Sequence, residues 1–276
     1  MQYVKILPPG SFCFHEAVLD MLNFAKLEAD NKIRFVEVGC GAGDLSAILL
    51  ARGYQGMGVD FSSNAIALAA ENLKSPIAEG RYQLLEGDIM QSDNVTKYRK
   101  AFNLALSMMV MEHIENDIQF IKNLAELTVP EGMVMLAVPG RMDRWGIEDD
   151  TVGHLRRYEN IDLQKVMEAA GLRDVTVWSV AVPTANMLFS LSNFFIKKSA
   201  EVTKVNSTLR EQTELSGIRE IPFKTVFPAW FRLILNRVTL YPLFMLQRLF
   251  YRTNLGLTML AVGRVVTKEE DDIANV

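Results

Sequence analysis

The chain has 276 residues, of which 49% are hydrophobic and 22% charged, and its formal net charge is −4. This length and hydrophobic share suit one large domain, or one domain with a sizeable insertion, and argue against global disorder. The slightly acidic balance excludes the strongly basic class of nucleic-acid-binding domains, so no nucleic-acid partner is expected.

The two cysteines, Cys13 and Cys40, are too few for a disulfide framework, and their spacing matches no metal-binding motif. We find no secretory signal pattern and no uninterrupted run of about 18 apolar residues. These features predict a cytoplasmic protein with reduced thiols, which leaves peripheral contact with the inner face of the membrane open.

Hydrophobic patterning predicts regular alternation of strands and helices over residues 30–180. The expected helices are 12–29, 44–51, 64–73, 117–127 and 161–170, and the expected strands are 33–38, 55–59, 81–85, 103–106, 133–138 and 175–180. Residues 130–132 are expected to form the turn before the strand at 133, and Ser62 and Ser63 are candidate helix caps. The alternation favours an α/β fold, with a mostly parallel sheet covered by helices on both faces.

This rhythm ends after residue 181. Residues 182–255 are rich in Phe, Leu and Met, and residues 257–262 then predict a seventh strand. The simplest organisation is an α/β domain formed by residues 1–181 and 256–268, with residues 182–255 as a helical insertion. The insertion would act as a lid or as a platform for a substrate or a membrane.

A glycine-rich loop follows the first predicted strand of the alternation, where residues 36–43 read Val-Glu-Val-Gly-Cys-Gly-Ala-Gly. Glycines at this point allow a tight turn and close approach of a ligand beyond the end of a strand. A dinucleotide-binding loop would need a third glycine at position 44, which is Asp44. A carboxylate there disfavours pyrophosphate, so a nucleoside-containing cofactor without phosphates fits better.

The loop resembles motif I of class I S-adenosylmethionine-dependent methyltransferases, E-x-G-x-G-x-G, and the resemblance continues in order through residues 33–180. It implies a doubly wound, Rossmann-like sheet of seven strands, with S-adenosyl-L-methionine as cofactor and S-adenosyl-L-homocysteine as product. An acidic residue would bind the ribose hydroxyls, and another the adenine amino group. The implied cofactor-binding residues are Glu37, Gly39, Cys40, Gly41, Gly43, Asp60, Phe61, Asp88, Ile89, Ser107 and Met108. Residues 127–132 resemble the family's L-x-P-G-G turn, except that Glu131 replaces the first glycine.

Two histidines are candidates for the acceptor side. His113 lies in a Glu-His pair like that of the ubiquinone O-methyltransferases, and His154 lies in a G-H-x-R-R-Y segment found in many bacterial members. Either imidazole suits proton removal near neutral pH, but a pocket-wall role for His113 and a latch role for His154 are alternatives. Arg156, Arg157 and Tyr158 are candidate substrate-binding residues. One arginine would bind an anionic acceptor, and the other would brace an acidic residue among 148–150.

We expect no metal, because a metal-dependent, catechol-type mechanism would need acidic ligands directly after the fourth strand, where residues 107–110 read Ser-Met-Met-Val, and the acidic loop at 143–150 is better explained as solvated. The insertion raises a separate question, because residues 221–268 contain no Asp or Glu. Their basic and aromatic side chains include Phe223, Lys224, Arg232, Arg237, Arg248, Arg252, Arg264 and Lys268. Such a segment suits a helical lid, a lipid-like acceptor, a membrane surface, or a protein partner such as a second subunit in a homodimer.

The sequence therefore predicts an enzyme that methylates a small, hydrophobic or lipid-like acceptor, with oxygen favoured as the acceptor atom. A nicotinamide-dependent oxidoreductase and a non-catalytic scaffold of the same fold remain as alternatives.

Overall fold

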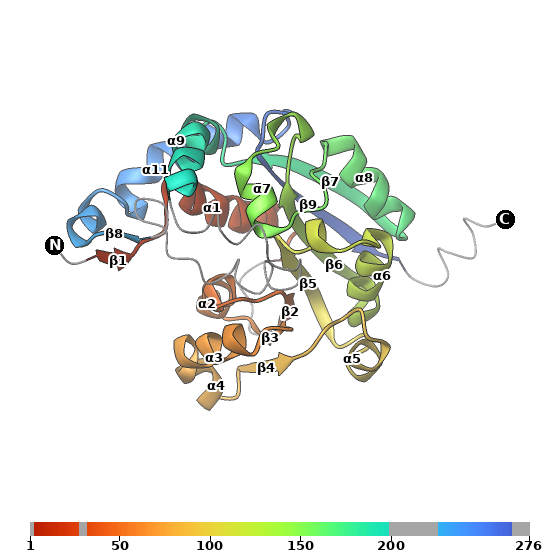
Figure 1. The fold of residues 1–276 in the computed structure, drawn as a ribbon. Coiled ribbons are helices and arrows are strands. Elements are labelled where there is room, and N and C mark those ends of the chain that lie inside the picture. Colours follow the sequence, from red (N-terminus) through yellow and green to blue (C-terminus); the bar gives the residue numbers. More distant parts are fainter. Residues whose placement is uncertain (1–2, 28–31, 199–225, 267–276) are drawn as a thin grey trace. The chain divides into compact units, whose positions relative to one another are not determined.

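A computed structural model describes residues 3–27, 32–198 and 226–266 of the chain (Figure 1). The chain forms two compact units, each assembled from separate segments. The first unit comprises Met1–Met21, Pro139–Asn160 and Trp178–Leu260, and the second comprises Leu22–Val138, Ile161–Val177 and Ala261–Val276.

The second unit contains most of a seven-stranded sheet in the order β4-β3-β2-β5-β6-β9-β7. Its strands are β2 (Arg34–Val38), β3 (Gln55–Asp60), β4 (Tyr82–Glu86), β5 (Phe102–Met108), β6 (Thr128–Pro139), β7 (Leu172–Val180) and β9 (Thr258–Val265). The pairs β4–β3, β3–β2, β2–β5 and β5–β6 are parallel. The predicted α/β fold with a mostly parallel sheet of seven strands is thus confirmed, and the last strand lies between β6 and β7.

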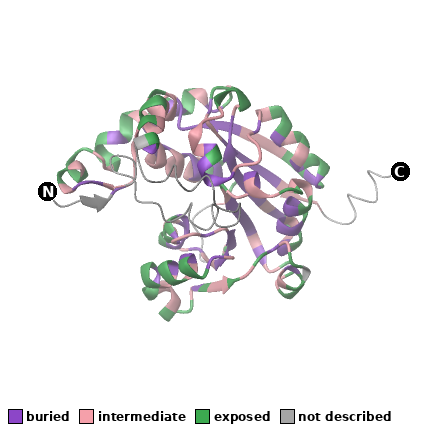
Figure 2. Cartoon of the chain, viewed as in Figure 1, coloured by how far each residue is buried: buried purple, intermediate pink, exposed green. Residues whose placement is uncertain are grey.

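Helices cover both faces of this sheet. They are α2 (Asp44–Ala51), α3 (Ser63–Asn72), α4 (Lys74–Ala78), α5 (Ser92–Lys97), α6 (Asp117–Leu127) and α8 (Asn160–Ala169). Figure 1 shows α2 and α3 on one side of the strands and α6 and α8 on the other. The central strands are buried almost completely, as Figure 2 shows, because parallel strands covered on both faces take apolar side chains throughout.

Most predicted elements are present, with boundaries that differ by a few residues. Ser62 caps α3 as expected, since its Oγ accepts a hydrogen bond from the Ala65 N–H at 3.4 Å. The turn predicted at 130–132 is wrong, because β6 already begins at Thr128. The pairing of β5 with β6 shifts register between Phe102 and Leu104, so the irregularity is absorbed inside the strand as a bulge.

In β6, Glu131 stands where the family's turn has its first glycine, and its surroundings show how this replacement is tolerated. Its backbone has the left-handed φ of 66°, which glycine adopts more readily than any other residue. Its carboxylate accepts from Arg264 of β9 at 2.6 Å, and Arg264 also binds Asp174 of β7 at 2.8 Å. The departure from the family's turn is therefore accommodated by an ion-pair cluster on three neighbouring strands.

The first unit contains a two-stranded antiparallel sheet, β1 (Tyr3–Lys5) with β8 (Val226–Pro228), and several helices. These are α1 (Pro9–Phe24), η2 (Met142–Arg144), α7 (Ile147–Val152), α9 (Thr184–Lys198), η4 (Ala229–Leu233), α11 (Arg237–Gln247) and η5 (Arg248–Phe250). Helix α1 begins earlier than the predicted residue 12 and ends at Phe24. No helix of the described ranges is long and apolar enough to cross a bilayer.

The expected insertion, residues 182–255, lies in this first unit together with the start of the chain. A small core joins Cys13 of α1, Ala181, and Leu240 and Phe244 of α11. Gln247 is fully buried and links the same segments, because it accepts from the Ala181 N–H at 3.1 Å and donates to the Cys13 carbonyl at 2.8 Å. Residues 199–225, which include Phe223 and Lys224, and the C-terminal residues from 267, which include Lys268, lie outside the described residues.

Candidate cofactor and acceptor sites

The glycine-rich loop connects β2 to α2 in the second unit. Gly39, Gly41 and Gly43 all have positive φ, at 75°, 52° and 82°. A Cβ atom at Gly39 would lie 2.3 Å from Val110, and one at Gly43 would lie 2.7 Å from Leu73, whereas at Gly41 it would meet no atom within 4 Å. The outer glycines therefore permit tight packing, and the middle glycine leaves open space at the centre of the loop.

Asp60, the last residue of β3, holds this loop in place. Its carboxylate accepts from the Gly41 N–H and from the Ser62 N–H, each at 2.9 Å. The side chain is almost buried, and Phe61 beside it is half-buried. Because a carboxylate has about four acceptor positions, both oxygens retain capacity for a further donor.

Glu37 lies in a buried polar cluster next to the loop. Its carboxyl accepts from the Ser46 hydroxyl at 2.5 Å, and the Ser46 oxygen lies 2.7 Å from the Tyr82 hydroxyl. Burial raises the pKa of Glu37 to about 8, although the bonds from Ser46 act in the opposite direction. At neutral pH this glutamic acid is therefore protonated, and its place beside α2 suits support of the loop.

Burial also raises the pKa of the Cys40 thiol within the loop. The neighbouring carboxyl groups of Glu37 and Asp60 add to this shift. Cys40 consequently remains a thiol at physiological pH and does not act as a nucleophile.

The remaining predicted cofactor residues follow β4 and end β5. Asp88 is exposed, and one of its carboxylate oxygens accepts from the Met90 N–H at 2.8 Å. Ile89 is buried, with its carbonyl bound to Asn123 of α6 at 2.8 Å. Ser107 donates to the Val38 carbonyl at 3.0 Å, and Met108 beside it is half-buried.

The sheet brings these side chains to one edge. Val38 of β2 pairs with Val59 of β3 and with Ser107 of β5, and Asp60 pairs with Glu86 of β4. Ligands of open α/β sheets bind beyond the carboxyl ends of such parallel strands. A nucleoside-containing cofactor would therefore be expected at this edge, beside the glycine loop, Asp60, Asp88 and Ser107.

His113 also lies in the second unit, at the end of the short 3-10 turn η1 (Met111–His113) that follows β5. His113 is half-buried, and its backbone N–H donates to the Val110 carbonyl at 2.9 Å. Val110 is the residue against which Gly39 packs, so the turn that carries His113 is joined to the glycine loop.

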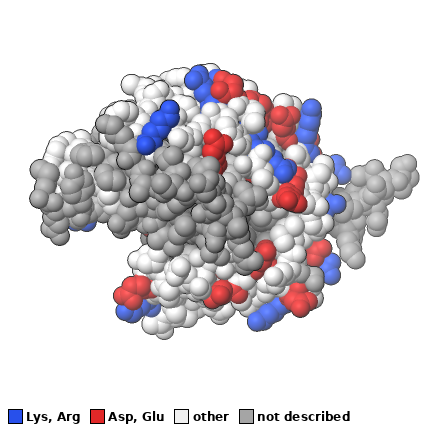
Figure 3. Space-filling model, in the orientation of Figure 1, with Lys and Arg blue, Asp and Glu red and all other residues white. Residues whose placement is uncertain are grey.

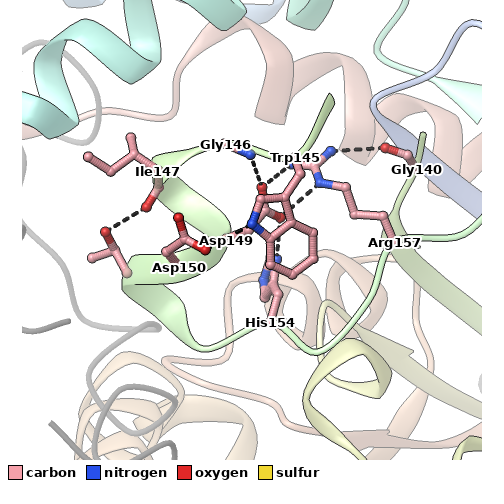
Figure 4. Close-up of polar contacts among 9 residues, drawn as sticks. Gly140, Trp145, Gly146, Ile147, Asp149, Asp150, His154 and Arg157 are labelled. Atoms are coloured by element: carbon pink, nitrogen blue, oxygen red, sulfur yellow. Dashed lines mark hydrogen bonds and ion pairs between the residues drawn. The ribbon is translucent and has the colours of Figure 1, made fainter. Parts of the chain in front are cut away.

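The G-H-x-R-R-Y segment lies in the first unit and is organised by one carboxylate (Figure 4). Asp149 of α7 is completely buried and binds His154 Nδ1 at 2.7 Å. It also accepts from Arg157 Nε at 2.8 Å, from Arg157 Nη2 at 2.9 Å and from the Gly146 N–H at 2.7 Å. Tyr158 is buried, and its backbone bonds to Pro139 and Arg141 fix the end of the segment.

The sequence had suggested that Asp149 belongs to a solvated acidic loop, and the structure shows that it does not. Burial alone would raise its pKa, but the hydrogen bonds from His154, Arg157 and the Gly146 N–H outweigh that effect and lower the pKa to about 2. The carboxylate stays ionised and orients both side chains. Asp143 and Asp150, by contrast, are exposed, with bonds to Arg141 and Trp145.

The two candidate arginines thus have different surroundings. Arg157 forms a two-point ion pair with Asp149 and donates to the Gly140 carbonyl at 2.9 Å, which matches the bracing role that the sequence allowed for one of the pair. Arg156 is half-buried and is the remaining candidate for an anionic group of an acceptor. Asp149 is the residue that sequence reasoning did not single out, because two other acidic residues adjoin it.

A family model and curated relatives both match this chain to methyltransferases. A family model described as a methyltransferase domain matches residues 12–177. A ubiquinone biosynthesis O-methyltransferase of Rickettsia canadensis (strain McKiel) is 28% identical over 115 residues, which cover 41% of this chain and 46% of that protein. The chain thus spans less than half the length of the curated relatives that it matches first.

Solved structures show the same fold. The phosphoethanolamine N-methyltransferase 2 of Haemonchus contortus, in complex with S-adenosyl-L-methionine, has a TM-score of 0.54 and 14% identity, covering 91% of this chain and 52% of that one. The cyclase SpnF has a TM-score of 0.57 and 16% identity, covering 91% and 81%. Because one neighbour is a methyltransferase and another a cyclase, the fold by itself does not determine the reaction.

Proposed function

The chain belongs to the methyltransferase family whose model spans residues 12–177, and on this premise we propose that it transfers a methyl group from S-adenosylmethionine to a hydrophobic or lipid-like acceptor. Oxygen is the favoured acceptor atom. The observation that carries the proposal is the glycine loop, whose open centre at Gly41 is tied by its N–H to the Asp60 carboxylate.

The residues present fit this donor. S-adenosylmethionine supplies a methyl group that is already activated on a sulfonium centre. Asp60 would accept from the ribose hydroxyls with its remaining acceptor positions, and the exposed Asp88 would accept from the adenine amino group. Glu37, which is neutral and buried, would support the loop from behind rather than touch the cofactor.

The alternative of a nicotinamide dinucleotide is disfavoured by Asp44. This residue is exposed in the first turn of α2, where a pyrophosphate would otherwise meet the positive end of the helix. Two like charges at this point would repel each other.

For the acceptor side we propose that His154 removes a proton and that Asp149 positions it. Asp149 binds Nδ1 at 2.7 Å, so a neutral imidazole would carry its proton on Nδ1 and act as a base through Nε2. Arg156 would bind an anionic group of the acceptor, and the buried Tyr158 would shape the segment. His113 is the second candidate for the base, because it follows β5 in a turn that packs on the glycine loop.

The acceptor can be tested with S-adenosylmethionine labelled in its methyl group. We would offer the chain pairs of phenols, carboxylic acids and amines that differ only in having a short or a long alkyl tail. The proposal expects label in the long-tailed phenol, as an ether that resists mild base. Labelling confined to the amines, or to the short-tailed member of each pair, would contradict the proposed acceptor. His154→Gln should lower kcat with little change in KM, and Gln164→Ala on an exposed face of α8 serves as the matched control.

A further inference from the structure

Helix α11 of the first unit has two apolar faces, although a helix on a protein surface normally needs one. Its inner face packs Leu240 and Phe244 against α1 and Ala181. Its outer face carries Val238, Tyr241 and Met245 at spacings of three and four residues, and Leu249 of η5 continues the same row. Val238 and Leu249 are 83% and 76% exposed, so these side chains contribute nothing to the core.

The same unit exposes two more apolar groups. The η4 segment before α11 exposes Trp230 and Leu233, and Ile234 directly after it is exposed as well. Helix α9 exposes Met187, Leu191 and Phe194, again at spacings of four and three residues. Single exposed apolar residues are ordinary, but rows at helical spacing mark an interaction surface.

Charge indicates what this surface meets. The described residues 178–198 and 226–258 contain no Asp or Glu, while Lys197, Arg232, Arg237, Arg248 and Arg252 are exposed. On the face that Figure 3 draws, a basic side chain among uncharged atoms lies at the place of α9. Within these segments every charged side chain is a cation, and aromatic and aliphatic side chains with cations are the composition of a helix that lies in the headgroup region of an anionic membrane.

Two arginines also fix the orientation of α11. Arg237 binds Glu16 at 2.9 Å, and Arg248 binds Asp20 at 2.7 Å, both on α1. The pairs neutralise the carboxylates of α1 that adjoin α11. They also hold the helix with Leu240 and Phe244 inward, so the row from Val238 to Leu249 is kept outward before any partner arrives.

We propose that the outer face of α9, η4 and α11 docks on the surface of a bilayer that contains anionic lipid. The apolar row would enter the headgroup region, and Arg232 and Arg252 would contact lipid phosphates. A second copy of the chain fits less well, because a two-fold symmetric contact through this face would bring two sets of arginines together with no Asp or Glu in these described segments to offset them. Docking on the bilayer does not depend on the methyl donor. Only the idea that the protein meets its acceptor there rests on the proposed function.

Vesicle co-sedimentation of the full chain tests the inference. We expect binding to vesicles of phosphatidylcholine with phosphatidylglycerol, weaker binding to phosphatidylcholine alone, and a decrease with added salt. Val238→Glu and Leu249→Glu should each weaken binding by about tenfold or more, because they remove apolar contact and add a repelling charge. Arg232→Gln and Arg252→Gln should each weaken it by about fivefold and reduce its salt dependence.

Ile161→Glu is the matched control, since Ile161 is 55% exposed on α8 of the second unit and should leave vesicle binding unchanged. Thermal unfolding of each variant shows whether the fold is retained. Absence of binding to anionic vesicles at low salt would overturn the inference, as would full binding by a folded Leu249→Glu variant. A wild-type dimer in sedimentation velocity that Leu249→Glu converts to a monomer, without vesicle binding, would assign the surface to a second copy instead.

Discussion

Glu37 shows how burial decides the role of a single motif residue. The sequence identifies it only as the acidic residue that opens the glycine loop, and the resemblance assigns it to the cofactor. Its depth in the protein, with the Ser46 hydroxyl at 2.5 Å, depends on how β2, α2 and β4 pack together. No local pattern encodes that packing, so its protonation state was not predictable from the sequence.

The raised pKa of Glu37 makes stability depend on pH in a defined direction. An unfolded glutamic acid titrates near 4.3, whereas the folded residue holds its proton up to about pH 8. Between these values the folded state binds the extra proton, so the free energy of unfolding falls as pH rises. Glu37→Gln cannot titrate and should therefore lack this fall between pH 5 and 8. Urea unfolding of both proteins across that range measures it, and parallel curves would refute a protonated Glu37.

The pH dependence of stability that Asp149 causes has the opposite sign to that of Glu37. Its folded pKa of about 2 lies below the ordinary value near 3.9, so its stabilising effect is fully present above pH 4 and is lost as pH falls toward 2. At pH 7, Asp149→Asn leaves Arg157 without its buried partner and should cost about 3 kcal/mol in the free energy of unfolding.

Asp150→Asn is the control for this change, because Asp150 is an exposed neighbour with one bond to Trp145. Urea unfolding at pH 7 should show a change within about 0.5 kcal/mol for that variant. Equal effects of the two substitutions would show that Asp149 is no more important than the surface residue beside it.

At the scale of elements, long periodic segments were predictable and short ones were not. Helix α6 matches its predicted range because its apolar residues repeat over about three turns, and α2 matches because the glycine loop and Gly53 bound it. Helices α5 and α7 have six residues each, which is too short for a repeat to be visible. Since α7 carries Asp149, the helix that organises the G-H-x-R-R-Y segment was among the elements that the sequence did not predict.

Alanine substitutions at two glycines can separate the effect of backbone strain from the effect of lost contact with the cofactor. Gly41 and Gly80 both have positive φ, at 52° and 71°, and a Cβ atom on either would meet no atom within 4 Å. Alanine at either position should therefore cost about 1 kcal/mol of stability through backbone strain alone. Only Gly41→Ala adds a methyl group where the cofactor is proposed to lie, so only this variant should lose affinity for S-adenosylhomocysteine by about tenfold or more.

Calorimetry with S-adenosylhomocysteine, together with urea unfolding, measures both effects. If Gly80→Ala lost as much affinity as Gly41→Ala, the loss would come from general destabilisation, and the loop would not be the contact surface.

At the scale of the whole molecule, segments that are far apart in the chain combine in ways that composition does not reveal. The change in composition at residue 181 follows directly after the end of β7 at Val180, but it does not show which segments accompany residues 182–255. Asp20 binds both Arg248 and Tyr251 across more than 220 residues of sequence, and Trp178 stacks on Tyr251 with ring centroids 4.4 Å apart. Such contacts follow from tertiary packing, so the composition of the first unit was visible only in the structure.

Binding of the methyl donor at the glycine loop is tested most directly by calorimetry of the full chain. We predict that S-adenosylhomocysteine binds with one site per chain and that NADH does not bind. Asp60→Asn should weaken the binding by about tenfold or more, since hydrogen bonds to a charged acceptor contribute roughly 1.5–3 kcal/mol. Glu71→Gln, which removes an exposed carboxylate from the following helix, should leave it unchanged. Tight binding of NADH with none of S-adenosylhomocysteine would contradict the account.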